Sequence, residues 1–164
     1  MAPRAVVRDI DMGYDKITSE IKKFRSKVVL TGFQEETVTK FQVKNGRVKK
    51  GGESMASIAA QNEFGAPGVP QRSFMRTAFD ENITRIYEVL ELQYGLVVDQ
   101  QITAKQALGE IGEFMIALIK RKITQITFPP NSPVTIALKG SSKPLVDTGQ
   151  MLNSVTYTIR RQNG

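Results

Sequence analysis

One segment, KGSSKPLVDTGQM (residues 139–151), is compatible with two different folds. Its triplet Asp147-Thr148-Gly149 is that of an aspartic protease, in which two such triplets share one proton and activate water within an all-β fold. The other interpretation is structural. Asp147 caps the free N–H groups of a helical turn, and Gln150, three residues later, completes a capping box. The choice separates an enzyme from a structural subunit.

The surroundings of the triplet favour the structural cap. A protease of this type needs several strands after its triplet, whereas only residues 150–164 follow it here. The best-defined segments of the chain are also helical in pattern, and a motif outside its structural context is mostly coincidence. We therefore expect no enzyme activity, and we expect Asp147 and Gln150 to cap a turn that starts the final element.

Composition excludes several classes of chemistry. The chain has 164 residues with ordinary hydrophobic and charged shares, which predicts a single domain over residues 1–164. It has no Cys and no His, so disulfides, Ser-His-Asp triads and His- or Cys-ligated metals are excluded. We expect no cofactor. The longest apolar segment, 114–119, is too short for a membrane helix, and no targeting segment follows Met1, so we expect no membrane contact and assembly in the cytoplasm.

A basic hairpin is predicted at about 37–50, projecting from the body of the molecule. Residues 37–43 alternate as a half-buried strand does, and Asn45-Gly46 favours a type I′ turn. With a net charge of +7, the chain suits an acidic partner. The alternative is an exposed hairpin whose lysines block edge pairing. The candidate contacts to DNA or an acidic partner are Lys40, Lys44, Arg47, Lys49 and Lys50.

Helical periodicity predicts two long helices. The first covers 74–94, is ended by Gly95, and has one apolar face made of Phe74, Met75, Ala78, Phe79, Ile83, Ile86, Leu90 and Tyr94. The second covers 103–126, with Thr103 as its cap. Both apolar faces predict core, since a cofactor pocket needs convergent polar groups. Shorter elements are predicted as a helix at 11–27, a strand at 28–33, a helix from Ser54 to Phe64 ended by Gly65, and a last strand at 155–160.

These elements predict an α+β fold, with a small antiparallel sheet packed against long amphipathic helices. Within this order, four segments resemble the neck and tail-completion proteins of long-tailed bacteriophages, which join head to tail. The segments are IAAQNEFG (residues 58–65), VPQRSFMR (69–76), PPNSP (129–133) and KGSSKPLVDTGQMLNSV (139–155). The resemblance covers about residues 54–159, and the triplet at 147–149 is similar to the family's pattern at each position.

The resemblance implies a virion structural protein without enzyme activity. Its subunits would form a ring at the head–tail junction, around the DNA passage, with neighbouring neck, portal-adaptor and tail proteins and transient contact with genomic DNA. A ring needs two different patches on each copy. We expect one in the segment 67–76 together with Phe64, and the other in the segment 132–145; the alternative is that these segments pack within the chain. The candidate interface residues are Phe64, Pro70, Arg72, Phe74, Arg76, Pro133, Leu138 and Leu145.

A second function class stays open. The same basic chain is compatible with a non-specific nucleic-acid-binding protein that reads charge alone, since no aromatic platform accompanies the hairpin's basic residues on its turn side. The two classes predict different behaviour. A ring subunit keeps its assembled form in salt, whereas phosphate contacts weaken steeply as salt rises, because they release counterions.

Overall fold

The structure is a computed structural model, and it describes residues 13–34, 41–44, 47–50, 54–127, 129–130, 145 and 149–162, with the backbone alone at 41–44 and 47–50. The helices are α1 (Tyr14–Arg25), α2 (Met55–Phe64), α3 (Phe74–Asp80), α4 (Ile83–Val98), α5 (Ala104–Gln125) and α7 (Gln150–Asn153). The strands are β1 (Lys27–Phe33), β2 (Phe41–Lys44), β3 (Arg47–Lys50) and β4 (Val155–Arg161). The predicted Asn45-Gly46 turn lies outside the described residues.

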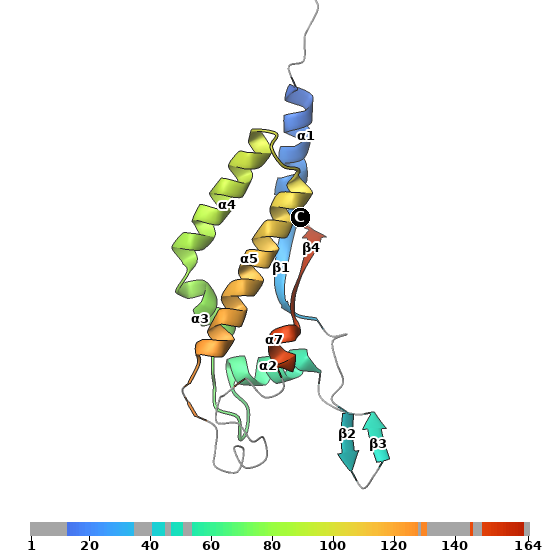
Figure 1. Cartoon of the computed structure of the whole chain (residues 1–164), viewed down its shortest axis with the longest axis vertical. Coiled ribbons are helices and arrows are strands. Elements are labelled where there is room, and N and C mark those ends of the chain that lie inside the picture. Colours follow the sequence, from blue (N-terminus) through green and yellow to red (C-terminus); the bar gives the residue numbers. More distant parts are fainter. Residues whose placement is uncertain are drawn as a thin grey trace, which may run out of the picture.

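The long helix α5 is the centre of the fold, with α4 on one side of it and the β1–β4 sheet on the other (Figure 1). The sheet is antiparallel and joins distant parts of the chain, with Lys27 opposite Arg161 and Phe33 opposite Val155. This confirms the α+β class and a small antiparallel sheet packed against a long helix. The predicted hairpin is also present as a separate two-stranded sheet of β2 and β3.

Close packing of the sheet on α5 depends on a glycine. A Cβ atom built at Gly112 would lie 2.5 Å from ring carbons of Tyr157, closer than real Cβ atoms approach any atom. Tyr157 therefore faces α5, and so do its neighbours two residues away on β4, because side chains alternate along a strand. Val155, on the same face, belongs to the core. Thr156, Thr158 and Arg160 are thus on the opposite face of the sheet.

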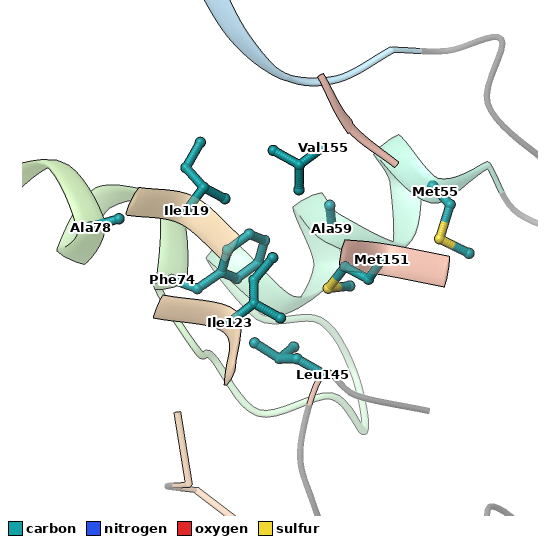
Figure 2. Packing of buried hydrophobic residues seen from close by; sticks show 9 residues of the cluster. All are labelled: Met55, Ala59, Phe74, Ala78, Ile119, Ile123, Leu145, Met151 and Val155. Carbon is teal, nitrogen blue, oxygen red and sulfur yellow. The ribbon is translucent and has the colours of Figure 1, made fainter. Parts of the chain in front are cut away.

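The main core lies where α2, α3, the C-terminal half of α5, α7 and the start of β4 meet (Figure 2). Phe74 is at its centre and is 0% exposed. The ring of Phe33 on β1 meets that of Phe74 edge-on, with centroids 6.0 Å apart. The buried members of this cluster are Met55, Ala59, Phe74, Ala78, Ile119, Ile123, Leu145, Met151 and Val155.

The first predicted long helix is in fact two helices. Glu81 still has right-handed helical dihedral angles, and the chain leaves the helical conformation at Asn82, which has φ −120° and donates a side-chain hydrogen bond to the Ala78 carbonyl at 2.9 Å. Such side-chain bonds to the backbone compete with the regular backbone hydrogen bonds of a helix. The expected end at Gly95 is also wrong, because α4 continues through Gly95 to Val98. The break lets α3 enter the core while α4 runs along α5.

The capping box predicted for Asp147 and Gln150 is wrong in register. Helix α7 begins at Gln150, directly after Gly149, whose φ of +73° lies in the left-handed region. Gln150 is therefore the first residue of the helix and not its third, and no side chain caps α7 at Gly149. Asp147 itself lies outside the described residues. The expectation that this segment leads into the last strand is confirmed, since α7 is followed by β4.

Candidate interaction surfaces

A buried carboxyl group joins α2 to α3. Glu63, in the last turn of α2, is 5% exposed, and its oxygens accept the backbone N–H groups of Met75 at 2.8 Å and Arg76 at 3.0 Å. The first N–H groups of a helix have no partner within it, and Ser73 at the N-cap of α3 makes no side-chain cap hydrogen bond. Glu63 caps α3 from a neighbouring helix. In the sequence, Glu63 lies within a family-like segment, but no local pattern assigns it this role.

The loop between these helices is closed by hydrogen bonds on both sides. The carbonyl oxygen of Glu63 accepts Nε2 of Gln71 at 3.2 Å and Oγ of Ser73 at 3.0 Å. Ala66 and Val69 form a bridge with backbone hydrogen bonds of 2.9 and 2.8 Å. Gly65 ends α2 as predicted, but its φ of +81° with a ψ of 156° is not the left-handed helical conformation; it is a combination that essentially only glycine adopts. The loop is therefore held in one shape.

Arg72 fastens this loop to the segment that follows α5. Its guanidinium group donates to the carbonyl oxygens of Pro129 at 2.8 Å and Pro130 at 3.1 Å, and to Oδ1 of Asn62 at 3.3 Å. Burial lowers the pKa of Arg72 by desolvation, but an arginine remains charged at neutral pH. The planar fork of arginine suits several fixed acceptors at once. Hydrogen bonds thus join two of the four segments that resemble the phage family, 58–65 and 69–76, to the first two residues of a third, Pro129 and Pro130.

The eight predicted interface residues have different locations. Phe74, Arg72 and Leu145 are buried within the chain, so they cannot serve as surface contacts to a second subunit, and the intramolecular alternative applies to them. Phe64, Pro70 and Arg76 are exposed. Phe64 is 67% exposed, and with Arg76 it borders a hollow of about 490 Å³ between β1, α2 and α3. Pro133 and Leu138 lie outside the described residues.

Helix α4 presents an apolar stripe, two of whose members are predicted as core from the sequence. Ile83 and Tyr94 are exposed, and Tyr87, four residues after Ile83, is 65% exposed. Their spacing of four and seven residues places them on one face of the helix. The buried side of α4 is a different one, which includes Ile86 and Val97. The helical periodicity of the sequence predicts an apolar face, but it does not distinguish the exposed stripe from the buried side of α4 next to it.

The β1–β4 sheet has an outer face, on the side away from Tyr157 and α5. Leu30 and Thr158 are directly opposite each other on the face away from Tyr157, and Leu30 is 48% exposed. With Thr156 and Arg160 they line a hollow of about 590 Å³. The charged residue of this face is Arg160, because Lys27 and Arg161, opposite each other, lie on the face of Tyr157. This outer sheet face is therefore basic and partly apolar.

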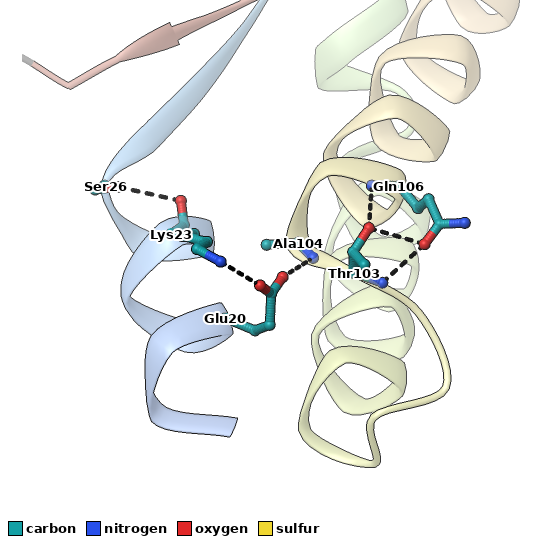
Figure 3. Close-up of polar contacts among 6 residues, drawn as sticks. All are labelled: Glu20, Lys23, Ser26, Thr103, Ala104 and Gln106. Atoms are coloured by element: carbon teal, nitrogen blue, oxygen red, sulfur yellow. Dashed lines mark hydrogen bonds and ion pairs between the residues drawn. The ribbon is translucent and has the colours of Figure 1, made fainter. Parts of the chain in front are cut away.

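A polar contact between α1 and α5 fixes the other end of the molecule (Figure 3). Glu20 accepts the ammonium group of Lys23 at 2.6 Å and the backbone N–H of Ala104 at 2.7 Å. These hydrogen bonds, that of Lys23 first, lower the pKa of Glu20 below its ordinary value of 4.5. Thr103 caps α5 as predicted, and Gln106 completes a capping box that was not predicted.

Of the five predicted DNA contacts, four lie on the described strands β2 and β3. Lys44 is directly opposite Arg47, and Lys49 and Lys50 continue β3. Lys40 lies outside the described residues. Among the residues that the structure describes, no group of three acidic side chains is placed to hold a metal ion. In the same ranges, every helix is too short or too polar to serve as a membrane span.

Comparison of the chain with protein-family models, with curated proteins and with solved structures found no match.

Proposed function

We propose that this chain is a virion structural protein of a long-tailed bacteriophage, a ring-forming neck or tail-completion subunit that joins head to tail around the DNA passage. The proposal starts from the four ordered segments that resemble this family. The observation that supports it most is the bond between Arg72 and the carbonyl oxygens of Pro129 and Pro130, 57 and 58 residues away. Residues of two motifs that are distant in sequence, 69–76 and 129–133, are therefore hydrogen-bonded to each other in the fold, as expected of motifs with a structural role.

The polar groups of this joint are engaged with the backbone of the chain itself. Glu63 caps α3, and Arg72 holds the segment after α5. A catalytic carboxyl group needs access to a substrate, whereas Glu63 is buried and bonded to two amides. The proposal therefore assigns no catalytic residue and no cofactor. Copies of this chain and the adjoining head and tail proteins are its partners, and the head–tail junction of the virion is its location.

Deletion of the gene from the phage that carries it tests this function. We expect DNA-filled heads and complete tails that do not join, because the missing ring connects them. Purified protein added to a mixture of such heads and tails should restore infectious particles. A deletion phage that makes intact particles at the normal yield would overturn the proposal.

The alternative function is non-specific nucleic-acid binding, which the paired basic strands β2 and β3 favour. Titration of the purified chain with duplex DNA at rising salt separates the two functions. If DNA binding is the main function, affinity is high at low salt and falls steeply, in proportion to the number of phosphates contacted. If the chain is a ring subunit, its oligomeric state is retained over the same range of salt.

A further inference from the structure

Two exposed surfaces of the chain differ in chemistry and lie on elements that α5 separates. The α4 stripe consists of Ile83, Tyr87 and Tyr94, and the outer sheet face consists of Leu30, Thr156, Thr158 and Arg160. Because α5 lies between α4 and the sheet (Figure 1), both surfaces of one copy can be occupied at the same time. This is the requirement for a heterologous contact, in which one patch meets a different patch on the next copy.

The two surfaces are complementary in charge. Glu88 and Glu91 are exposed on α4 close to the stripe, and neither forms an ion pair with a described residue. Asp99 follows α4, and the single basic residue of α4, Arg85, lies over the ring of Phe114 on α5. The outer sheet face, by contrast, carries Arg160 and no acidic residue, since Lys27 and Arg161, opposite each other, lie on the face of Tyr157. Opposite charges at the rim of an interface favour the correct partner and its orientation.

The surfaces are also complementary in shape. The outer sheet face has a hollow of about 590 Å³, bordered by Leu30 and Arg160, whereas Tyr87 on α4 is 65% exposed and the ring of Tyr94 lies 5.8 Å from that of Phe24 on α1. Tyrosine is enriched at protein interfaces, because its ring fills an apolar hollow while its hydroxyl group stays hydrated. We infer that the α4 stripe of one copy docks on the outer sheet face of the next copy, with Tyr87 in the hollow and Glu91 facing Arg160. This inference rests on the proposed ring.

The absence of cysteine from the chain permits a clean cross-linking test. One variant carries Tyr87→Cys and another carries Thr158→Cys. The two proteins are oxidised separately and as an equal mixture, and the products are identified by mass spectrometry. The inferred contact predicts a disulfide-linked dimer between positions 87 and 158 in the mixture, and at least a tenfold lower yield of dimer in either protein alone. The control, Ala117→Cys on the exposed side of α5, should not cross-link with either variant above background.

Each other outcome overturns the contact. A disulfide between two copies of the Tyr87→Cys variant, formed in that protein alone, means that α4 packs on α4 of another copy. An unlinked mixture that still forms rings means that the ring uses other surfaces. A chain that remains monomeric at all concentrations has no such contact. A charge exchange checks the result without cysteine: Glu91→Arg and Arg160→Glu should each abolish assembly, and the double variant should restore it.

The cross-linking experiment tests the contact between copies, and the gene deletion tests the head–tail function. If rings form without the disulfide between positions 87 and 158, the inferred contact is wrong and the proposed head–tail function is unaffected. If that disulfide forms but deletion of the gene does not affect virions, the contact is confirmed and the proposed head–tail function is wrong.

Discussion

The buried carboxyl group of Glu63 accepts the backbone N–H of Met75 at 2.8 Å, and this contact sets the position of α3 relative to α2. Phe74, the residue before Met75, is thereby directed into the centre of the core, where it is 0% exposed. A single side chain outside α3 thus fixes both the start of the helix and its packing. The same joint shows why Phe74 cannot serve as an exposed contact between subunits.

Substitution of Glu63 by glutamine should destabilise the chain. The amide group of Gln can accept one backbone N–H, but its NH₂ group then faces the other one, leaving a buried donor unsatisfied. We expect a loss of about 1–3 kcal/mol in the free energy of unfolding, measured by urea denaturation. Glu110→Gln, at an exposed position on α5, is the matched control and should change the free energy by less than about 0.5 kcal/mol. Equal effects of both substitutions would contradict the capping role of Glu63.

Arg72→Lys tests the joint between the loop and the segment after α5. Lysine keeps the positive charge but cannot reach the carbonyl oxygens of Pro129 and Pro130 and the side chain of Asn62 together. We expect the free energy of unfolding to fall by about 2–3 kcal/mol, since hydrogen bonds to a charged group contribute about 1.5–3 kcal/mol. Arg76→Lys changes the same residue type at an exposed site and should be nearly neutral. If Arg72→Lys is equally neutral, Arg72 does not hold this segment.

The contact between Gly112 and Tyr157 predicts that substitution by alanine destabilises the chain at Gly112, whereas it stabilises the chain at Gly95. Gly112→Ala places a methyl group against the tyrosine ring and should cost about 1–3 kcal/mol through overpacking. Gly95→Ala, inside α4 with no atom within 4 Å of the added Cβ, should stabilise the chain by about 0.5–1 kcal/mol. Both are measured by thermal and urea unfolding. Stabilisation by Gly112→Ala would show that β4 does not pack on α5 at this position.

The Glu20 contact predicts a dependence of stability on pH. The pKa of Glu20 is lowered in the folded chain, so its contribution is fully present above the ordinary value of 4.5 and is lost as pH falls through the folded pKa. The difference in unfolding free energy between the unmodified chain and Glu20→Gln should therefore be largest near neutral pH and shrink below pH 4.5. We expect at most about 1 kcal/mol, because the side chain of Lys23, the partner of Glu20, is 56% exposed and solvent screens its charge.

Lys23→Gln is the control for this pH dependence. It removes the first cause of the lowered pKa and leaves the Ala104 amide in place, so the variation of stability with pH should be smaller but still present. Urea titrations from acidic to neutral pH measure both variants. A difference between the unmodified chain and Glu20→Gln that stays constant across this range would rule out the Glu20 contact as its source.

Local signals in the sequence are sufficient for several elements. Thr103 is predicted as the cap of α5, and Ser54 as the start of α2, since both depend on bonds within one turn. The last strand is predicted from its alternation of apolar and polar residues. Its pairing with β1 is not predictable, because the partner is more than a hundred residues away and periodicity carries no information about which strands meet.

The errors have a common physical origin in contacts between distant segments. The apolar spacing of 74–94 is compatible with one helix, and only the packing of α3 in the core and of α4 along α5 requires a break at Asn82. Arg72 is expected at an interface because it lies in the segment 67–76, and its acceptors at Pro129 and Pro130 give no signal in sequence. The left-handed Gly149 likewise makes Gln150 the first residue of α7, where a capping box requires it to be the third.

The location of the chain in the phage particle tests the central proposal most directly. A peptide tag at the N-terminus of the chain, introduced into the phage genome and labelled with gold-conjugated antibody, can be imaged by electron microscopy of purified virions. The proposed function predicts gold at the junction of head and tail. Virions without label, from cells in which the tagged chain is abundant and infectious particles are produced, would contradict it.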